Sequence, residues 1–271
     1  MAGRDDPAGL LAVAEEVART AGAVLLAHQR RLRAGEDAGV QTKSSATDPV
    51  SVADADSERV LVEALTAARP DDGLLGEEGA HRRGSTGLRW VVDPLDGTVN
   101  FLYGHPGWSV SVAVEREEPD GTWRGIAGAV LDPVADQLFA AHVDGPATCD
   151  GIEIAVNDPV ELPHALIGTG FSYERDRRLV QAEVVTRVLA AARDVRRVGS
   201  AALDLCAVAA GRVDGYYEDT TQRWDWAAGV VIARQAGAVV TPLTTQAGTS
   251  GVVASGPALH ADLVALVTAG S

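Results

Sequence analysis

The feature that most constrains the fold is a pair of aspartates that directly follows a short apolar segment. The segment Trp90-Val91-Val92 continues into Asp93-Pro94-Leu95-Asp96-Gly97-Thr98. Apolar residues in this setting predict a buried strand, which would deliver Asp93 at its carboxyl end. Because Pro94 has no backbone N–H, we expect strand pairing to stop there. Asp96 returns three residues later, so both carboxylates are expected to face one pocket.

Two carboxylates placed this closely repel each other, and a divalent cation would relieve the repulsion. Oxygen-only ligands suit magnesium or manganese rather than zinc, and the Leu95 carbonyl is a further candidate ligand. Gly97 permits close backbone approach, and Thr98 adds a hydroxyl and an amide, so the pair predicts a short anion cradle. The alternative is a solvated Asp-Pro-x-Asp-Gly turn that holds no ligand.

Two further acids favour the metal site. Glu77 lies in Gly76-Glu77-Glu78-Gly79, directly after the apolar pair Leu74-Leu75. Asp225 lies in Trp224-Asp225-Trp226, where a helix is predicted to begin. Taken singly, Glu77 could be a solvated loop acid and Asp225 a helix N-cap.

The net charge limits the partners of the chain. Its 38 acidic and 23 basic residues give a formal charge of −15. Such a surface repels a phosphate backbone, so we do not expect direct nucleic-acid binding. It also repels phosphorylated metabolites, so an acidic protein that handles phosphate would need bound cations in its site.

Length and composition indicate a globular protein. The chain has 271 residues, 46% of them hydrophobic and 23% charged, which allows one large domain or two modest ones. The start of the sequence lacks the apolar core of a secretory signal, so we expect a cytoplasmic protein. No apolar run approaches the roughly 20 residues that cross a bilayer. Cys149 and Cys206 form no C-x-x-C pair, so we expect buried thiols.

Apolar periodicity predicts an α/β fold class. Helical spacing indicates a long first helix over residues 10–25 and a second around residues 60–65. Strand candidates at 89–92, 110–114, 126–131 and 137–143 suggest an antiparallel-leaning sheet. Helices at 178–192, 202–210 and 225–235 then alternate with short strands at 195–198, 215–217 and 252–254. We therefore expect an α+β, metal-binding half over 1–157 and an α/β, substrate-binding half over 158–271.

The motifs occur in an order that resembles the inositol monophosphatase family, in its branch of bacterial inositol-1-monophosphatases. The resemblance spans nearly the whole chain, and several independent motifs in the right order make it specific. The motifs are Lys43-Ser44-Ser45, Asp48, Asp54, Gly76-Glu77-Glu78, Asp93 to Phe101, Gly199-Ser200-Ala201-Ala202, Tyr216-Tyr217-Glu218 and Trp224-Asp225.

The resemblance implies a fold, an assembly and a cofactor. The fold is a layered αβαβα arrangement of the sugar-phosphatase type, usually in a homodimer. The cofactor is magnesium, at two or three ions per subunit, and lithium is expected to inhibit. The implied metal ligands are Glu77, Asp93, the Leu95 carbonyl, Asp96 and Asp225.

The resemblance also implies roles in catalysis and substrate binding. Glu77 and Thr98, the latter paired with Asp54, would position and activate the attacking water. Gly97 and Thr98 would meet the phosphate, while Gly199 to Ala201 and Glu218 would contact the alcohol. The whole implied substrate-binding set is Lys43, Leu95, Asp96, Gly97, Thr98, Gly199, Ser200, Ala201, Glu218 and Asp225, with Lys43 balancing charge near the metals.

The expected reaction is the hydrolysis of a small phosphate monoester by water, with in-line displacement and no covalent intermediate. Myo-inositol 1-phosphate is the expected substrate. The sequence has no G-x-S-x-G elbow, P-loop or G-x-G-x-x-G, so serine hydrolases, P-loop NTPases and dinucleotide enzymes lack their local signatures. His105 follows the metal motif, and we expect it in the pocket wall or core rather than on a metal.

Two positions depart from the family pattern. Val99 stands where many relatives carry Thr, which removes a hydroxyl without changing a ligand. Trp226 is bulky where smaller residues are usual, directly after Asp225. We expect Trp226 to narrow or reshape the mouth of the site, which leaves the size of the substrate open.

Several alternatives stay open. The same chemistry could act on histidinol phosphate, fructose 1,6-bisphosphate or a nucleotide 3′-phosphate, since Glu218 suits polyol hydroxyls and an ammonium group equally. The alternative from another class is a regulatory protein that binds RNA or a protein partner. The acidic surface disfavours RNA but does not exclude a protein.

Overall fold

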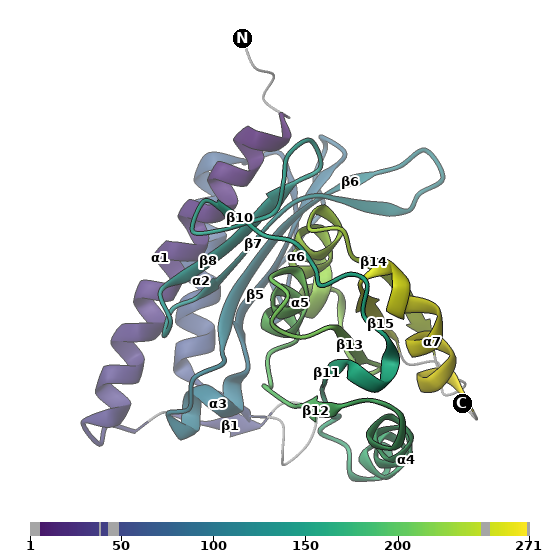
Figure 1. Ribbon diagram of the computed structural model, residues 1–271. Coiled ribbons are helices and arrows are strands. Elements are labelled where there is room, and N and C mark those ends of the chain that lie inside the picture. Colours follow the sequence, from purple (N-terminus) through teal and green to yellow (C-terminus); the bar gives the residue numbers. More distant parts are fainter. Residues whose placement is uncertain (1–5, 38, 43–48, 245–249, 270–271) are drawn as a thin grey trace.

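The computed structural model of the chain describes residues 6–37, 39–42, 49–244 and 250–269. It has five layers, helix, sheet, helix, sheet and helix (Figure 1). The first layer is α1 (Pro7–Arg33) and α2 (Val52–Ala68), the third is α5 (Ala201–Ala209) and α6 (Arg223–Gln235), and the fifth is α4 (Arg175–Ala191) and α7 (Pro257–Thr268). The αβαβα arrangement expected from the family resemblance is therefore confirmed.

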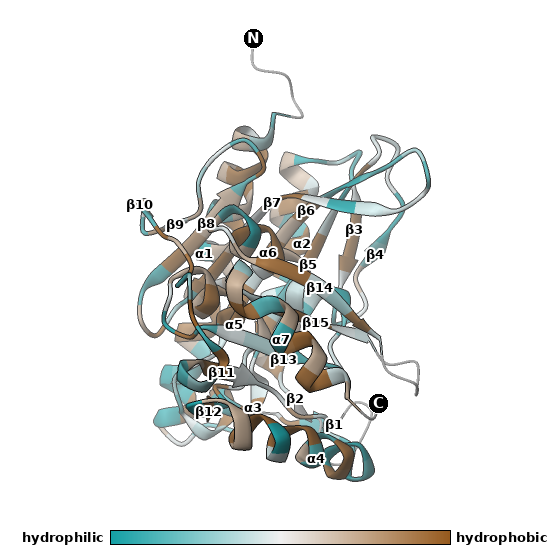
Figure 2. Cartoon of the chain, turned by 45° about the vertical axis from the view of Figure 1, so that its right-hand side comes forward, coloured by the Kyte–Doolittle hydropathy of each residue, from teal (hydrophilic) through white to brown (hydrophobic). Residues whose placement is uncertain are grey.

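The larger sheet has eight strands, antiparallel except where β3 runs parallel to β5. Its order is β10 (Ile152–Glu153), β9 (Thr148–Cys149), β8 (Gln137–His142), β7 (Trp123–Asp132), β6 (Ser109–Glu117), β5 (Leu88–Asp96), β3 (Gly73–Gly76) and β4 (His81–Arg82). Helices cover both faces, so the central strands are buried on both sides, as in β6 from Ser109 to Glu115. Figure 2 shows β3 and β5 largely in brown, the colour of hydrophobic residues.

The smaller sheet has five strands, with parallel pairing on one side and antiparallel pairing on the other. Its order is β12 (Asp194–Arg196), β11 (Leu166–Thr169), β13 (Gly215–Glu218), β15 (Ser250–Ser255) and β14 (Val239–Thr244). The remaining elements are β1 (Gln41–Thr42), β2 (Pro49–Val50), α3 (Thr98–Tyr103) and the 3-10 turn η1 (Leu162–His164). None of the helices in the described part of the chain is both long and apolar enough to span a membrane.

The elements predicted from periodicity are confirmed, with bounds that shift by a few residues and are longest relative to the prediction in α1 and α2. The first helix runs over Pro7–Arg33, and it buries Leu10, Ala14, Val17, Ala18, Ala21 and Leu25 at helical spacing. The short elements α3, β11 and β14 and the last helix α7 lay outside the sequence prediction. The division into residues 1–157 and 158–271 stays a prediction, and α5 and α6 of the second half pack against the sheet of the first.

The prediction that Pro94 ends strand pairing is wrong. Strand β5 continues to Asp96, with Asp93 opposite Ser111 and Asp96 opposite Ser109 on β6. Three steps along β5 therefore match two along β6, and the extra residue is a bulge in the ladder. A bulge accommodates proline because the extra residue makes no ladder hydrogen bond. The two aspartates thus belong to one bent, hydrogen-bonded strand, not to a free turn.

The third layer lies directly on the large sheet because β7 carries a glycine at the contact. A Cβ atom built on Gly128 would lie 2.7 Å from the carbonyl oxygen and 2.9 Å from the Cα of Ala228 on α6. Both atoms belong to backbone, so they cannot rotate away as a side chain could. Gly128 therefore sets the height of α6 above the sheet, and α6 begins with Asp225 in its first turn.

We predict that Gly128→Ala lowers the free energy of unfolding by about 1–3 kcal/mol, because the added methyl pushes against the backbone of α6. Gly9→Ala is the control, since a Cβ there meets nothing within 4 Å and Gly9 lies in helix α1. It should leave stability unchanged or raise it slightly. Urea denaturation of both variants measures the difference, and equal stability of the two would contradict the close contact.

Candidate active site

A cavity of about 800 Å³ opens where β3, β5, α5, α6 and β13 end or begin. Its lining includes four carboxylates singled out in the sequence, Glu77, Asp93, Asp96 and Asp225. Among the other lining residues are Leu95, Gly97, Thr98, Gly199, Ala201 and Glu218. The fold therefore brings most of the predicted site residues to one cavity. Lys43 lies outside the described residues.

Three separate elements deliver the four carboxylates. Strand β3 runs parallel to β5 with Gly76 opposite Val92, so Glu77 follows directly beside Asp93. Asp93 and Asp96 lie on the two sides of the bulge in β5. Asp225 is the third residue of α6, which Gly128 holds close to the sheet. The cluster therefore depends on strand pairing, the bulge and helix packing together.

Hydrogen bonds fix one oxygen on each of the three aspartates. Asp93 Oδ1 accepts the Leu95 N–H at 3.0 Å. Asp96 Oδ2 accepts the Ser200 hydroxyl at 2.6 Å and the Ala202 N–H at 2.9 Å. Asp225 Oδ2 accepts the N–H of Gln222, the N-cap residue of α6, at 2.6 Å. Asp225 is therefore not the N-cap considered from the sequence but the third residue of the helix, whose carboxylate accepts the N–H of the N-cap residue and also lines the cavity.

Burial, and then repulsion from neighbouring acids, raises the pKa of the three aspartates. Burial raises the pKa of Asp93 well above its usual value, and repulsion by Glu77, Asp96 and Asp225 adds to it. Burial raises the pKa of Asp96 to about 6, although hydrogen bonds from Ser200 and Ala202 pull in the opposite direction. Burial, then Asp96 and Glu77, raise the pKa of Asp225 well above its usual value. The cluster therefore resists holding all its negative charges unaided.

The donor set fits a hard divalent cation. Four carboxylates supply oxygen ligands of the kind that magnesium prefers, and a cation would relieve their mutual repulsion. Within the described residues, no three His, Cys, Asp or Glu side chains already converge as a metal cluster. The Leu95 carbonyl also accepts the Thr98 hydroxyl at 3.1 Å. The fit therefore rests on the chemistry and charge of the ligands. A metal ion would have to bring the carboxylates closer together than they lie here.

Thr98 and Asp54 form the pair that the family resemblance implies. The Thr98 hydroxyl lies 3.1 Å from Asp54 Oδ1, and Asp54 is fully buried in the first turn of α2. The other oxygen of Asp54 accepts both the N–H and the hydroxyl of Ser51, at 2.9 and 2.6 Å. Asp54 is thus held rigidly, so it can fix the direction in which Thr98 points its proton.

Gly97 needs its lack of a side chain for two reasons. Its φ is +92°, in the left-handed region, and it caps the short helix α3. A Cβ there would also lie 2.9 Å from the Gly107 carbonyl oxygen. Gly97 and Thr98 both line the cavity, and the anion cradle made by their amides stays a prediction.

Glu218 ends β13 and lines the same cavity. Its Oε2 accepts the Tyr216 hydroxyl at 2.7 Å. Burial raises the Glu218 pKa to about 7, the hydrogen bond from Tyr216 opposes that rise, and repulsion by Asp96 adds to it. Glu218 is therefore an oriented acceptor in the same cavity as the four carboxylates.

The Ser200 side chain makes its hydrogen bonds to other groups of the protein. It caps α5 by accepting the Leu203 N–H at 3.1 Å, it donates to Asp96, and its hydroxyl lies 3.1 Å from that of Ser109. Ser200 is buried and is not among the lining residues, unlike its neighbours Gly199 and Ala201. Contact of Ser200 with substrate stays a prediction.

Two sequence expectations are wrong. Trp226 does not line the active-site cavity, whereas its neighbour Trp224 does, so Trp226 does not reshape the mouth of the site. His105 is exposed and lies outside the cavity lining, so it belongs to neither pocket wall nor core. Both expectations rested on closeness in sequence, but neighbouring residues of a helix or loop point in different directions.

Sequence reasoning missed Asp204 and Arg197. Asp204 lies on the otherwise apolar helix α5, where it is buried and its Oδ1 has no hydrogen-bond partner among the described residues. Burial, then repulsion by Glu218 and Asp96, raise its pKa well above the usual value. Arg197 lines the cavity and lowers the pKa of Glu218. One acid among eight apolar residues of α5 was the available signal for Asp204.

Comparison with known proteins agrees with the site. The model of the inositol monophosphatase family matches residues 6–270. The inositol-1-monophosphatase of Mycobacterium bovis is 43% identical, over 96% of this chain and 94% of its own. The Nus factor SuhB of Xylella fastidiosa is 42% identical, over 83% and 78%. The crystal structure of the extragenic suppressor protein suhB from Bartonella henselae superposes with a TM-score of 0.84 at 33% identity, covering 94% of this chain and 97% of that one.

We predict that the stability of the metal-free protein falls as the pH rises from about 5 to 8. The pKa values of Asp93, Asp96 and Asp225 are raised in the folded protein, so the folded protein binds protons at these groups more tightly than the unfolded chain does. Proton binding at these groups therefore stabilises the fold at low pH, and this stabilisation is lost as the pH rises through about 6 and above. Saturating magnesium should raise the melting temperature at pH 8 by about 5 °C or more, and by less at pH 5.

Melting curves in chelator and in magnesium at the two pH values measure this effect. Asp93→Asn keeps the hydrogen bond to Leu95 but removes one repelling charge. It should stabilise the chelated protein at pH 8 while reducing the gain from magnesium. A magnesium effect that is the same at both pH values and in the variant would refute the charge-relief account.

Proposed function

The chain belongs to the inositol monophosphatase family and is a phosphatase, and we propose that it hydrolyses myo-inositol 1-phosphate to inositol and phosphate with magnesium. The observation that carries the proposal is the set of four mutually repelling carboxylates around one cavity, whose lining also includes Gly97, Thr98 and Glu218. A polyol phosphate would place its ester group at the acids and its hydroxyls toward Glu218.

Glu77, Asp93, the Leu95 carbonyl, Asp96 and Asp225 would hold two or three magnesium ions. Bound magnesium supplies positive charge that stabilises the phosphoryl and leaving oxygens as the ester bond breaks. The pKa shifts support this assignment, because burial favours the protonated, neutral form of these acids, and a nearby cation would favour the charged form again.

Thr98 and Glu77 would orient the attacking water. While Thr98 donates its proton to Asp54, its oxygen has lone pairs left that can accept a hydrogen bond from water. Glu77, beside Asp93 in the same cavity, can accept the other proton of that water. Water directed in this way forms the new bond to phosphorus as the bond to the alcohol breaks, and the N–H groups of Gly97 and Thr98 would hold the phosphate.

Specificity for a polyol would come from Glu218. Tyr216 holds one of its oxygens, which leaves the other for substrate hydroxyls. The same arrangement would suit the ammonium of histidinol phosphate, and Arg197 in the lining could receive the second phosphate of fructose 1,6-bisphosphate. These two substrates are the alternatives on the same site.

A regulatory role is the second candidate function. It is favoured by the 42% identity to a protein named Nus factor SuhB. The charge of −15 makes a protein partner the better candidate than RNA. A gel shift with structured RNA at two salt concentrations separates these, since binding that persists at high salt would favour RNA recognition. We further propose a cytoplasmic homodimer inhibited by lithium, which rests on the family alone.

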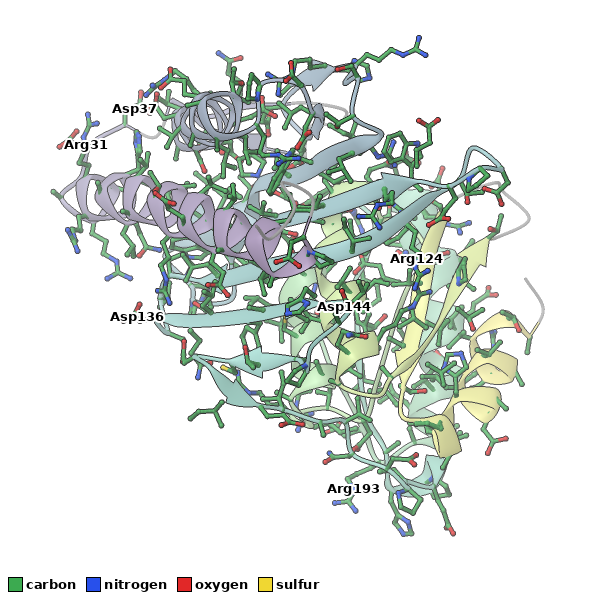
Figure 3. All side chains as sticks on the ribbon, turned by 90° about the horizontal axis from the view of Figure 1, so that it is seen from above. Arg31, Asp37, Arg124, Asp136, Asp144 and Arg193 are labelled. Atoms are coloured by element: carbon green, nitrogen blue, oxygen red, sulfur yellow. The ribbon has the colours of Figure 1, made fainter. Side chains whose placement is uncertain are left out.

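We predict that phosphate release requires magnesium and that Asp93→Asn lowers kcat/KM by about 100-fold or more, the usual scale for one charged active-site group. The control is Asp136→Asn, the same chemical change on an exposed residue at the edge of the molecule (Figure 3). Asp136 has φ +54°, which asparagine tolerates, so activity should be unchanged. The assay compares inositol 1-phosphate, histidinol phosphate and fructose 1,6-bisphosphate with and without magnesium.

Full activity of Asp93→Asn, or of the wild type in chelator, would contradict the metal assignment. Preference for histidinol phosphate or fructose 1,6-bisphosphate would overturn the substrate while leaving the chemistry in place.

We also predict that Glu218→Gln weakens the use of inositol 1-phosphate by about tenfold to a hundredfold, because one charge-assisted hydrogen bond to a hydroxyl is lost. p-Nitrophenyl phosphate has no such hydroxyl, so its kcat/KM should change much less. Steady-state kinetics on both substrates test this. Equal losses would mean that Glu218 acts through the metals or the fold instead.

A further inference from the structure

A second cavity, of about 310 Å³, lies beside α6 and shares no lining residue with the active-site cavity. It is bounded by the Trp123 end of β7, by Glu115 of β6, and by β14 and β15. Figure 1 shows α6 and β14 next to that end of the larger sheet. One helix therefore separates two cavities.

The residues of α6 divide between the cavities by helical spacing. Those that line the second cavity follow one face of the helix, at Arg223, Trp226, Ala227, Val230, Val231, Arg234 and Gln235. Trp224 and Asp225 point to the active site instead. Trp226, the departure from the family pattern, thus belongs to this second cavity.

The lining of the second cavity carries three arginines, Arg124, Arg223 and Arg234, and one carboxylate, Glu115. The carboxylate is fully buried and already pairs with two arginines, Arg223 within the lining and Arg89 beside it. The guanidinium of Arg223 also lies 4.2 Å from the centre of the Trp226 ring. Glu115 therefore neutralises Arg89 and Arg223, and it does not pair with Arg124 or Arg234.

Arg124 and Arg234 make no ion pair with any acid in the described part of the chain. Glu118 and Asp144 border an adjoining hollow that Arg124 also lines, but neither comes within ion-pair distance of it. Burial, then repulsion by Arg223 and Arg124, lower the pKa of Arg234. Arg124 and Arg234 are both exposed, so water screens their charges in part, but two neighbouring cations without an acid partner still attract an anion.

The rest of the lining is apolar and includes Val143, Val230, Val231, Pro242 and Val252. The indole N–H of Trp226 is buried and finds no hydrogen-bond acceptor among the described residues. Such a donor is costly to bury unless an acceptor reaches it. The volume would hold roughly ten waters, or a ligand with one or two rings.

We propose that this cavity binds a small organic anion, with an acid group that pairs with Arg124 and Arg234 and an apolar body that packs on the valines and Pro242. The proposal stands apart from the phosphatase function, because the two cavities share no residue.

Isothermal titration with naphthalene-2-sulfonate tests the proposal. Saturable binding at one site per chain is expected, with inorganic sulfate and neutral naphthalene-2-methanol each at least about tenfold weaker, since each lacks half of the ligand. Arg124→Glu and Arg234→Glu should each weaken sulfonate binding at least about tenfold. Asp93→Asn should leave it unchanged, which separates this site from the catalytic one.

Arg193→Glu is the matched control, because Arg193 is exposed and lies far from Arg124 (Figure 3). It carries the same change in net charge and should leave binding unchanged. Melting curves check that each variant is folded, and Arg234→Gln replaces Arg234→Glu if the latter is not. No saturable sulfonate binding by the wild type, or an equal loss in Arg193→Glu, would overturn the proposal.

Discussion

The repulsion among four carboxylates around one cavity, of which Asp93 is buried and the other three are half-buried, is the constraint on which the rest of the structure depends. Such charges do not gather in a protein interior without a means of holding them, and here three separate elements do so. Parallel pairing of β3 with β5 places Glu77, the bulge in β5 places Asp93 and Asp96, and α6 places Asp225. Holding these negative charges together costs electrostatic free energy, and a bound divalent cation would remove that cost. The proposed metal binding and the proposed phosphate chemistry would therefore both follow from this cluster of acids.

Much of the site could be predicted from the sequence because its residues are local to strand and helix ends. An apolar segment followed by two acids, and an acid at a helix start, already indicated the carboxylates on β5 and α6. Linking Asp54 to Thr98, which are 44 positions apart, needed the family resemblance, and the structure places their oxygens 3.1 Å apart. The five layers likewise came from the resemblance, while periodicity gave the individual helices and strands.

The sequence alone could not show which way side chains point, or that the backbone of a strand can accommodate a proline within a bulge. Pro94 was expected to end β5, but a bulge carries the strand past it because an unpaired residue needs no N–H. Trp226 and His105 lie near the carboxylates Asp225 and Asp96 in sequence, yet Trp226 lines another cavity and His105 is exposed to solvent. Asp204 was missed because the acids that raise its pKa, Glu218 and Asp96, are far from it in sequence and come near it only in the fold.

Anomalous diffraction from crystals grown with manganese tests the central claim most directly. Manganese prefers the same oxygen ligands as magnesium and can be located by its scattering. The account predicts strong anomalous peaks inside the active-site cavity, each within bonding distance of at least two of Glu77, Asp93, Asp96 and Asp225. A catalytically active crystal form whose map is empty there, or whose peaks lie elsewhere, would contradict it.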